Sequence, residues 1–73
     1  MTPALKKLAR MAKSRDESTS VELWFTIETV HFVAKKLVWA SANLPNHKAL
    51  AEFLREHADT LAVAVVDYAE GKL

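Results

Sequence analysis

The chain has 73 residues, no cysteine and a net charge of only +1, and 51% of its residues are hydrophobic. A chain this short forms one domain at most (1–73), and without disulfides or thiolate metal sites it depends on regular packing or on association for its stability. No apolar run approaches the roughly 18 residues that cross a bilayer, and no signal-peptide core follows the basic start of the chain. We therefore expect a cytoplasmic protein that does not act at a membrane.

The first predicted helix covers residues 3–15 and is basic and amphipathic. Thr2 can cap it, and Pro3 suits the first helical position. The segment contains no acidic residue, so it forms a basic arm suited to an acidic protein or to the phosphates of a nucleic acid. Its basic residues are Lys6, Lys7, Arg10, Lys13 and Arg15.

The second predicted helix covers residues 20–43. Thr19 and Glu22 have the spacing of a capping box, which marks its start. Apolar or small residues then recur at alternating intervals of four and three, which is the heptad spacing of helices that pack along one seam. The predicted seam is Leu23, Ile27, Val30, Ala34, Leu37, Ser41 and Leu44.

The third predicted helix covers residues 46–70, with Gly71 as its C-terminal cap. The short connection around Pro45 implies that it runs antiparallel to the second helix. The predicted fold is therefore all-α: a long antiparallel helical hairpin plus a short basic N-terminal helix, assembled as a homodimeric bundle. The seam predicted for the third helix is Leu50, Leu54, His57, Leu61, Ala64 and Tyr68.

Both long helices have more apolar surface than one seam accounts for. Large side chains repeat every seven residues on the side of the second helix opposite its seam, and the third helix is apolar almost all round near its end. A helix with two apolar sides is buried on both, so we expect a second interface. A homodimer, a different protein and cover by the first helix are all open explanations. The residues predicted to bind the partner or the second copy are Val21, Trp24, Phe25, Phe32, Trp39, Val63 and Val66.

Catalytic and metal chemistry find little support in the sequence. Glu28 and His31 form a Glu-x-x-His pair, but the further inward glutamates of a carboxylate di-iron bundle are not evident. No nucleophile has both a base and an orienting group, and a single glycine at position 71 excludes a glycine-rich phosphate loop. We expect no cofactor, no metal and no enzymatic activity.

The function predicted from these features is that of a protein-binding module, acting as a regulator, inhibitor or anti-activator of a second protein. In size and simplicity the chain is similar to small phage or mobile-element proteins that bind and inhibit a host protein, a similarity of scale that no motif carries. The alternative is a nucleic-acid-binding or transcription-regulating protein that uses helix 3–15. That helix offers phosphate contacts but no aromatic, Asn or Gln side chain to read bases.

Overall fold

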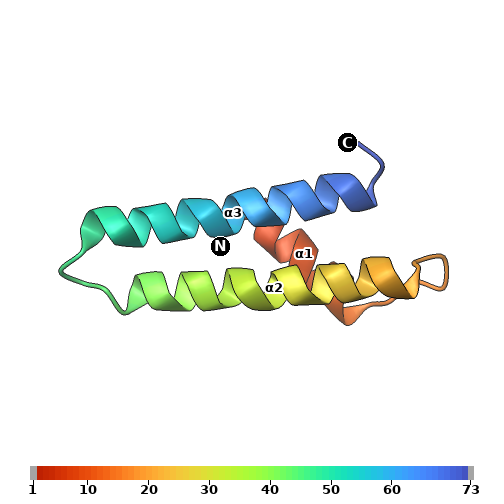
Figure 1. Ribbon diagram of the computed structural model, residues 1–73, viewed down its shortest axis with the longest axis horizontal. Helices are drawn as coiled ribbons and strands as arrows, with labels where there is room; N and C mark the ends of the chain where they lie inside the picture. The colour runs from red at the N-terminus through yellow and green to blue at the C-terminus, as the bar shows by residue number, and fades with distance from the viewer. Residues whose placement is uncertain (1, 73) are drawn as a thin grey trace.

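Three helices make up the computed structural model, which describes residues 2–72 (Figure 1). Helix α1 spans Pro3–Lys13, α2 spans Val21–Ala42 and α3 spans Lys48–Ala69. No strand occurs among the described residues, so the predicted all-α class is confirmed. Helix α1 ends at Lys13 rather than at Arg15, and α3 begins at Lys48 rather than at Asn46.

Local hydrogen bonds determine where the helices begin and end. The Thr2 hydroxyl accepts from the Leu5 N–H at 3.3 Å, and the Ser20 hydroxyl accepts from the Leu23 N–H at 3.1 Å. The side chain that caps α2 is thus Ser20 and not Thr19, which was predicted to do so. At the end of α3, Gly71 adopts a left-handed φ of 73°. This conformation lets the N–H groups of positions 71 and 72 bond back to carbonyls of the last helical turn.

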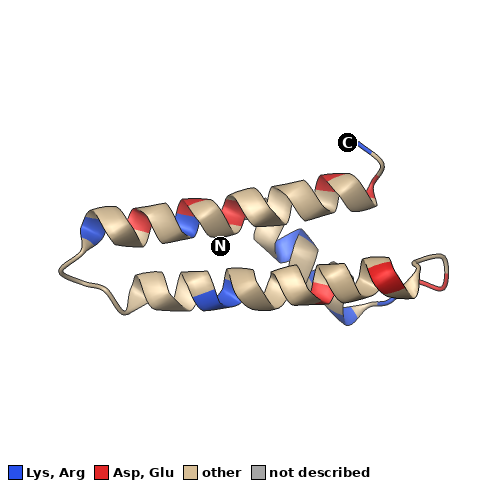
Figure 2. Cartoon of the chain, viewed as in Figure 1, with Lys and Arg blue, Asp and Glu red and all other residues tan. Residues whose placement is uncertain are grey.

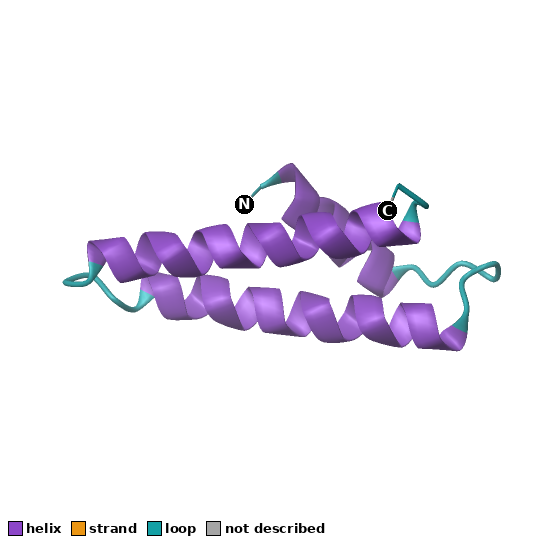
Figure 3. Ribbon diagram, turned by 45° about the horizontal axis from the view of Figure 1, so that its top comes forward, coloured by secondary structure: helices purple, strands orange, loops and turns teal. Residues whose placement is uncertain are grey.

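Helices α2 and α3 lie side by side along most of their length, joined at one end by residues 43–47 (Figure 1). Helix α1 is shorter and crosses behind this pair, where it contacts both long helices. The view in Figure 3 shows that α1 lies on one face of the pair and leaves the other face uncovered. The molecule is accordingly elongated, with extents of 45 × 21 × 17 Å.

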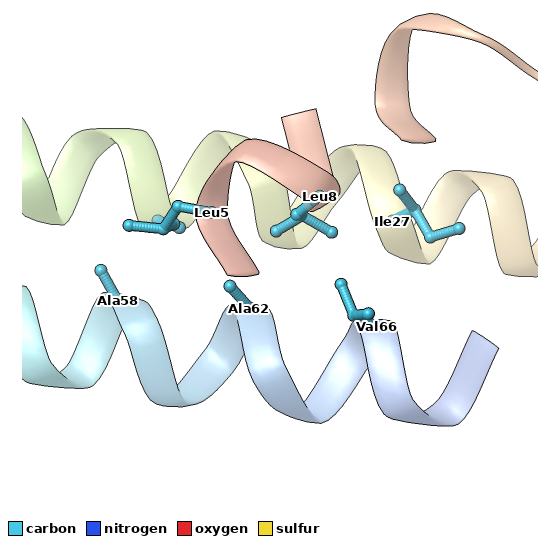
Figure 4. Packing of buried hydrophobic residues seen from close by; sticks show 7 residues of the cluster. Leu5, Leu8, Ile27, Ala58, Ala62 and Val66 are labelled. Atoms are coloured by element: carbon cyan, nitrogen blue, oxygen red, sulfur yellow. The ribbon is translucent and has the colours of Figure 1, made fainter. Parts of the chain in front are cut away.

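The core lies where α1 meets the pair. Leu5 and Leu8 of α1 point into the space between the long helices, across from small side chains of α3 (Figure 4). Leu8 is the largest fully buried side chain among the described residues. Small residues on α3 leave room for these leucines, which fill the gap between the helices. The buried cluster is Leu5, Leu8, Ile27, Ala34, Ala58, Ala62 and Val66.

Burial along α2 confirms the seam predicted for it. Ile27, Ala34 and Ser41 are buried, and the other four seam residues are half-buried. The Ser41 hydroxyl donates to the Val38 carbonyl at 2.7 Å, so its burial leaves no unpaired donor. The heptad period of this stripe was sufficient to predict which side of α2 faces the core.

The seam predicted for α3 is wrong. Its residues Leu50, His57 and Tyr68 are exposed, whereas the buried residues are Ala51, Ala58, Ala62 and Val66. The difference of about one residue corresponds to a rotation of about 100° around the helix axis. The physical reason is that α3 must admit the α1 leucines, so its line of small side chains faces the core. The bulkier heptad residues then face outward.

We expect Leu8→Ala to lower the free energy of unfolding by about 2–5 kcal/mol, because it leaves a cavity where three helices meet. Val63→Ala is the matched control, since Val63 is 41% exposed, and it should change that free energy by less than about 0.5 kcal/mol. Urea unfolding followed by circular dichroism at one protein concentration measures both variants. A loss below about 1 kcal/mol for Leu8→Ala would contradict the placement of α1 in the core.

Candidate functional site

A line of exposed apolar side chains runs along α2. Val21, Phe25, Phe32 and Trp39 are 60 to 66% exposed and follow one another at intervals of four and seven residues. With about 3.6 residues per turn, this line stays on one side of the helix over ~27 Å. We call these four residues the α2 ridge. It lies opposite the buried seam that faces α3, as the sequence predicted.

Trp24 was predicted to belong to the same surface, but it is half-buried. The guanidinium of Arg15 lies over its ring, 5.6 Å from the centroid, so a cation–π contact fastens the connection 14–20 to α2. The indole Nε1 is buried without a hydrogen-bond partner among the described residues. Leaving a donor unpaired in this way costs about 1–3 kcal/mol. Trp24 therefore packs beside the ridge and is not part of it.

The two α3 valines that were predicted as binding residues do not lie with the ridge. Val66 is only 5% exposed and belongs to the core, so its predicted position away from the core is wrong. The cause is the rotation of α3 described above. Val63 is exposed, but it lies four residues from both Asp59 and Asp67 and shares the polar side of α3 with them. The ridge points away from α3, so neither valine adjoins it.

The basic residues of the N-terminal segment fall on two sides of α1. The Lys7 ammonium donates to the Glu70 carboxylate and ties α1 to the end of α3. This hydrogen bond holds the pKa of Glu70 below its ordinary value. Lys6, Arg10 and Lys13 share the exposed side of α1 and form no ion pair with any residue between 2 and 72.

The C-terminal end of α1 brings the charge of Lys13 close to α2. At the other end of α1, a hydrogen bond from the Thr2 hydroxyl to the Asp59 carboxylate joins the helix to α3, as the Lys7 pair also does. On α2, burial lowers the pKa of His31, and the nearby charges of Lys35 and Lys13 lower it further. Figure 2 shows basic residues on α1 and in the second half of α2, and acidic residues spread along α3. Positive charge therefore borders the α2 ridge.

A hollow of about 220 Å³ opens where α1 meets α2. Apolar side chains of both helices line most of it, and Trp39 connects it to the ridge. Next to it, the Lys36 ammonium lies 5.5 Å from the centre of the Phe32 ring. The ridge and the hollow thus form one apolar surface with cations at its border. The residues that line the hollow are Leu5, His31, Lys35, Val38 and Trp39.

The part of the chain that the structure describes contains no group of three or more His, Cys, Asp or Glu residues that could hold a metal ion. Glu28 is exposed on α2, and His31, three residues later, lines the hollow. None of the helices formed by residues 2–72 combines the length and the apolar character needed to cross a bilayer.

Comparison of the chain with protein-family models, with curated proteins and with solved structures finds no match. The fold and the site therefore define its class on their own. It is a small three-helix protein in which a basic helix crosses one face of two long helices. An exposed aromatic ridge lies beside that crossing.

We expect the stability of the protein to depend on His31 at mildly acidic pH. Its pKa lies below the ordinary 6.5, so the unfolded chain binds this proton more readily than the folded chain. The stabilisation is therefore present above about pH 6.5 and is lost as the pH falls through the lowered pKa. Urea unfolding at about pH 5 and pH 7.5 should show a smaller loss of stability for His31→Gln than for the wild type. Equal losses in the two proteins would contradict this role of His31.

Proposed function

We propose that this chain is a non-enzymatic protein-binding module, and that the α2 ridge and the adjoining hollow bind an acidic amphipathic helix of another protein. The observation that carries this proposal is the exposure of the ridge, 60 to 66% for each of its four side chains. Large contiguous apolar patches on a soluble protein mark interaction sites.

The shape of the surface favours a helical ligand. The ridge is straight, and its ~27 Å equal the length of about 18 helical residues. Its intervals of four and seven match the spacing at which one helix packs side chains between those of another. The hollow offers a place for one large anchoring side chain, the kind of contact that dominates interface energies.

The charges at its border favour an acidic ligand. Lys35 and Lys36 flank the ridge on α2, and the exposed side of α1 adds further cations. Opposite charges around an apolar centre speed encounter and reject ligands of the wrong sign. A module that binds in this way prevents the apolar face of that helix from contacting another protein, which supports a role as a regulator, an inhibitor or an anti-activator.

A nucleic-acid ligand is the second candidate. The observation that favours it is the presence of Phe32 and Trp39, both exposed, beside lysines and the basic side of α1. Single-stranded nucleic acids bind surfaces that combine stacking rings with cations. The acidic residues along α3 oppose close approach of a second stretch of phosphates. This candidate therefore ranks below a protein ligand.

The test uses Trp39 as a fluorescent reporter in a Trp24→Phe background. The probe is a synthetic peptide of about 18 residues with leucine on one helical face and glutamate on the other. We expect its binding to shift the Trp39 emission to the blue. Phe32→Ser should raise the Kd tenfold or more, equivalent to about 1.4 kcal/mol. The control Val63→Ser, on the polar side of α3, should leave the Kd within about twofold.

Two further ligands complete the test. A peptide with lysine in place of each glutamate should bind at least tenfold more weakly, about 1.4 kcal/mol. A single-stranded oligothymidylate should bind weakly. For each phosphate contacted, its association constant should fall by about 0.7 log units when the salt concentration rises tenfold. The proposal fails if neither peptide shifts the Trp39 emission, or if Phe32→Ser and Val63→Ser bind alike. Tighter binding of the oligonucleotide than of the acidic peptide would favour the nucleic-acid alternative instead.

A further inference from the structure

We infer that two copies of the chain associate through the face of the α2–α3 pair that α1 leaves uncovered, so that four long helices form one bundle. This face is distinct from the α2 ridge, and the inference does not depend on the proposed function. Its exposed apolar side chains are Val33 of α2 and Leu50, Phe53 and Tyr68 of α3, and the half-buried Leu37 and Leu61 lie at its centre, where the two helices meet. We call these six residues the open face.

The contacts of α1 show which side of α3 is covered. Thr2 bonds Asp59 and Lys7 bonds Glu70, so α1 lies on the side of α3 that carries these two acids. Leu50 lies nine residues before Asp59, which is half a turn around the helix at about 100° per residue. The open face of α3 is therefore turned away from α1, toward the viewer in Figure 1, where nothing lies in front of the helix pair.

Charged residues avoid the open face. Between positions 49 and 69, every Lys, Arg, Asp and Glu of α3 lies on the other half of the helix at about 100° per residue. On α2, Glu28, Lys35 and Lys36 lie on the side of the ridge. Glu22, in the first turn, lies at the margin of the open face. Helix α3 thus has an uncharged side along almost its whole length, apolar apart from His57, which stacks on Phe53. Helix α2 continues this side with apolar residues from Val30 to Ala40, whereas Thr26 and Thr29 make its first half polar. A continuous apolar side of this kind is typical of a buried helix side.

The surface area of one copy supports the same conclusion. The chain exposes 5284 Å², whereas a compact monomer of 8.2 kDa exposes roughly 4,500 Å². The excess is close to the ~800 Å² per partner that a stable interface buries. The radius of gyration of 13.0 Å likewise exceeds the about 11 Å expected of a compact domain of this length. One copy therefore resembles half of a larger bundle.

A second copy fits the open face better than it fits the α2 ridge. In a twofold dimer each patch meets the same patch of the partner, so any charge on it faces a like charge. The open face lacks such charges, whereas the ridge would bring Lys35 and Lys36 close to their own copies. The heptad of α3, which the core of one copy does not use, is also the repeat that packs long helices into four-helix bundles.

The experiment measures the molar mass by light scattering at micromolar concentration, for the wild type and three variants. We expect the wild type to have about twice the chain mass of 8.2 kDa and to retain it in Phe32→Asp, which alters the ridge. Ala64→Lys places a charge on the open face at an exposed position and should halve the measured mass. Ala49→Lys, the same change on the polar side of α3, should leave the mass unchanged.

A second readout keeps the test valid if Ala64→Lys unfolds more easily. Because a dimer is stabilised by mass action, the urea midpoint of the wild type should rise with protein concentration, and that of Ala64→Lys should not. Val33→Lys, on the α2 side of the open face, should behave like Ala64→Lys in both measurements. A monomeric wild type would overturn the inference. So would a dimer that survives both lysine variants, or one that Phe32→Asp dissociates while Ala64→Lys does not.

Discussion

Two long helices packed side by side have a contact line but hardly an interior, and the insertion of Leu5 and Leu8 from α1 gives this protein its core. Full burial of a leucine contributes about 1.5–3 kcal/mol, which is a large share of the stability of a domain this small. The insertion is possible because α3 presents Ala58 and Ala62 at the crossing point. The other features of the surface depend on this contact, because it determines which sides of the long helices are buried and which stay exposed.

Helix α1 has 11 residues, against 22 in each long helix, so it reaches along only part of one face of the pair. Everything that it does not cover is left to solvent or to another molecule. On α2, what is left is the ridge opposite α3. On the pair as a whole, it is the open face opposite α1. The two surfaces are both apolar, but only the ridge has cations at its border, and this difference assigns them different partners in our proposals.

The sequence predicted the parts of the fold in which one periodic signal dominates. Helix α2 has a seam of medium-sized residues and a line of aromatic residues opposite, so the heptad spacing oriented it correctly. Helix α3 is apolar around most of its circumference, and spacing alone then selects the bulkiest stripe, from Leu50 to Tyr68. The structure instead buries the alanines, because the leucines of α1 need room. The residue spacing within α3 carries no information about which side chains of α1 will pack against it. This is why Val66 was predicted to lie on the wrong side of the helix. Trp24 lies beside the aromatic line, and its contact with Arg15 could not be predicted, because the connection that carries Arg15 has no period.

The orientation of α1 links the core to the charged border of the ridge. With Leu5 and Leu8 held between the long helices, α1 cannot rotate about its axis, and Lys7 must then meet Glu70 at the end of α3. The same constraint turns Lys6, Arg10 and Lys13 outward, and it brings Lys13 close to His31 of α2. Basic side chains on a free helix would be a diffuse positive charge. Because the leucines fix this helix, the charge of Lys13 stands at one edge of the apolar surface, where it would help to select the acidic ligand that we propose.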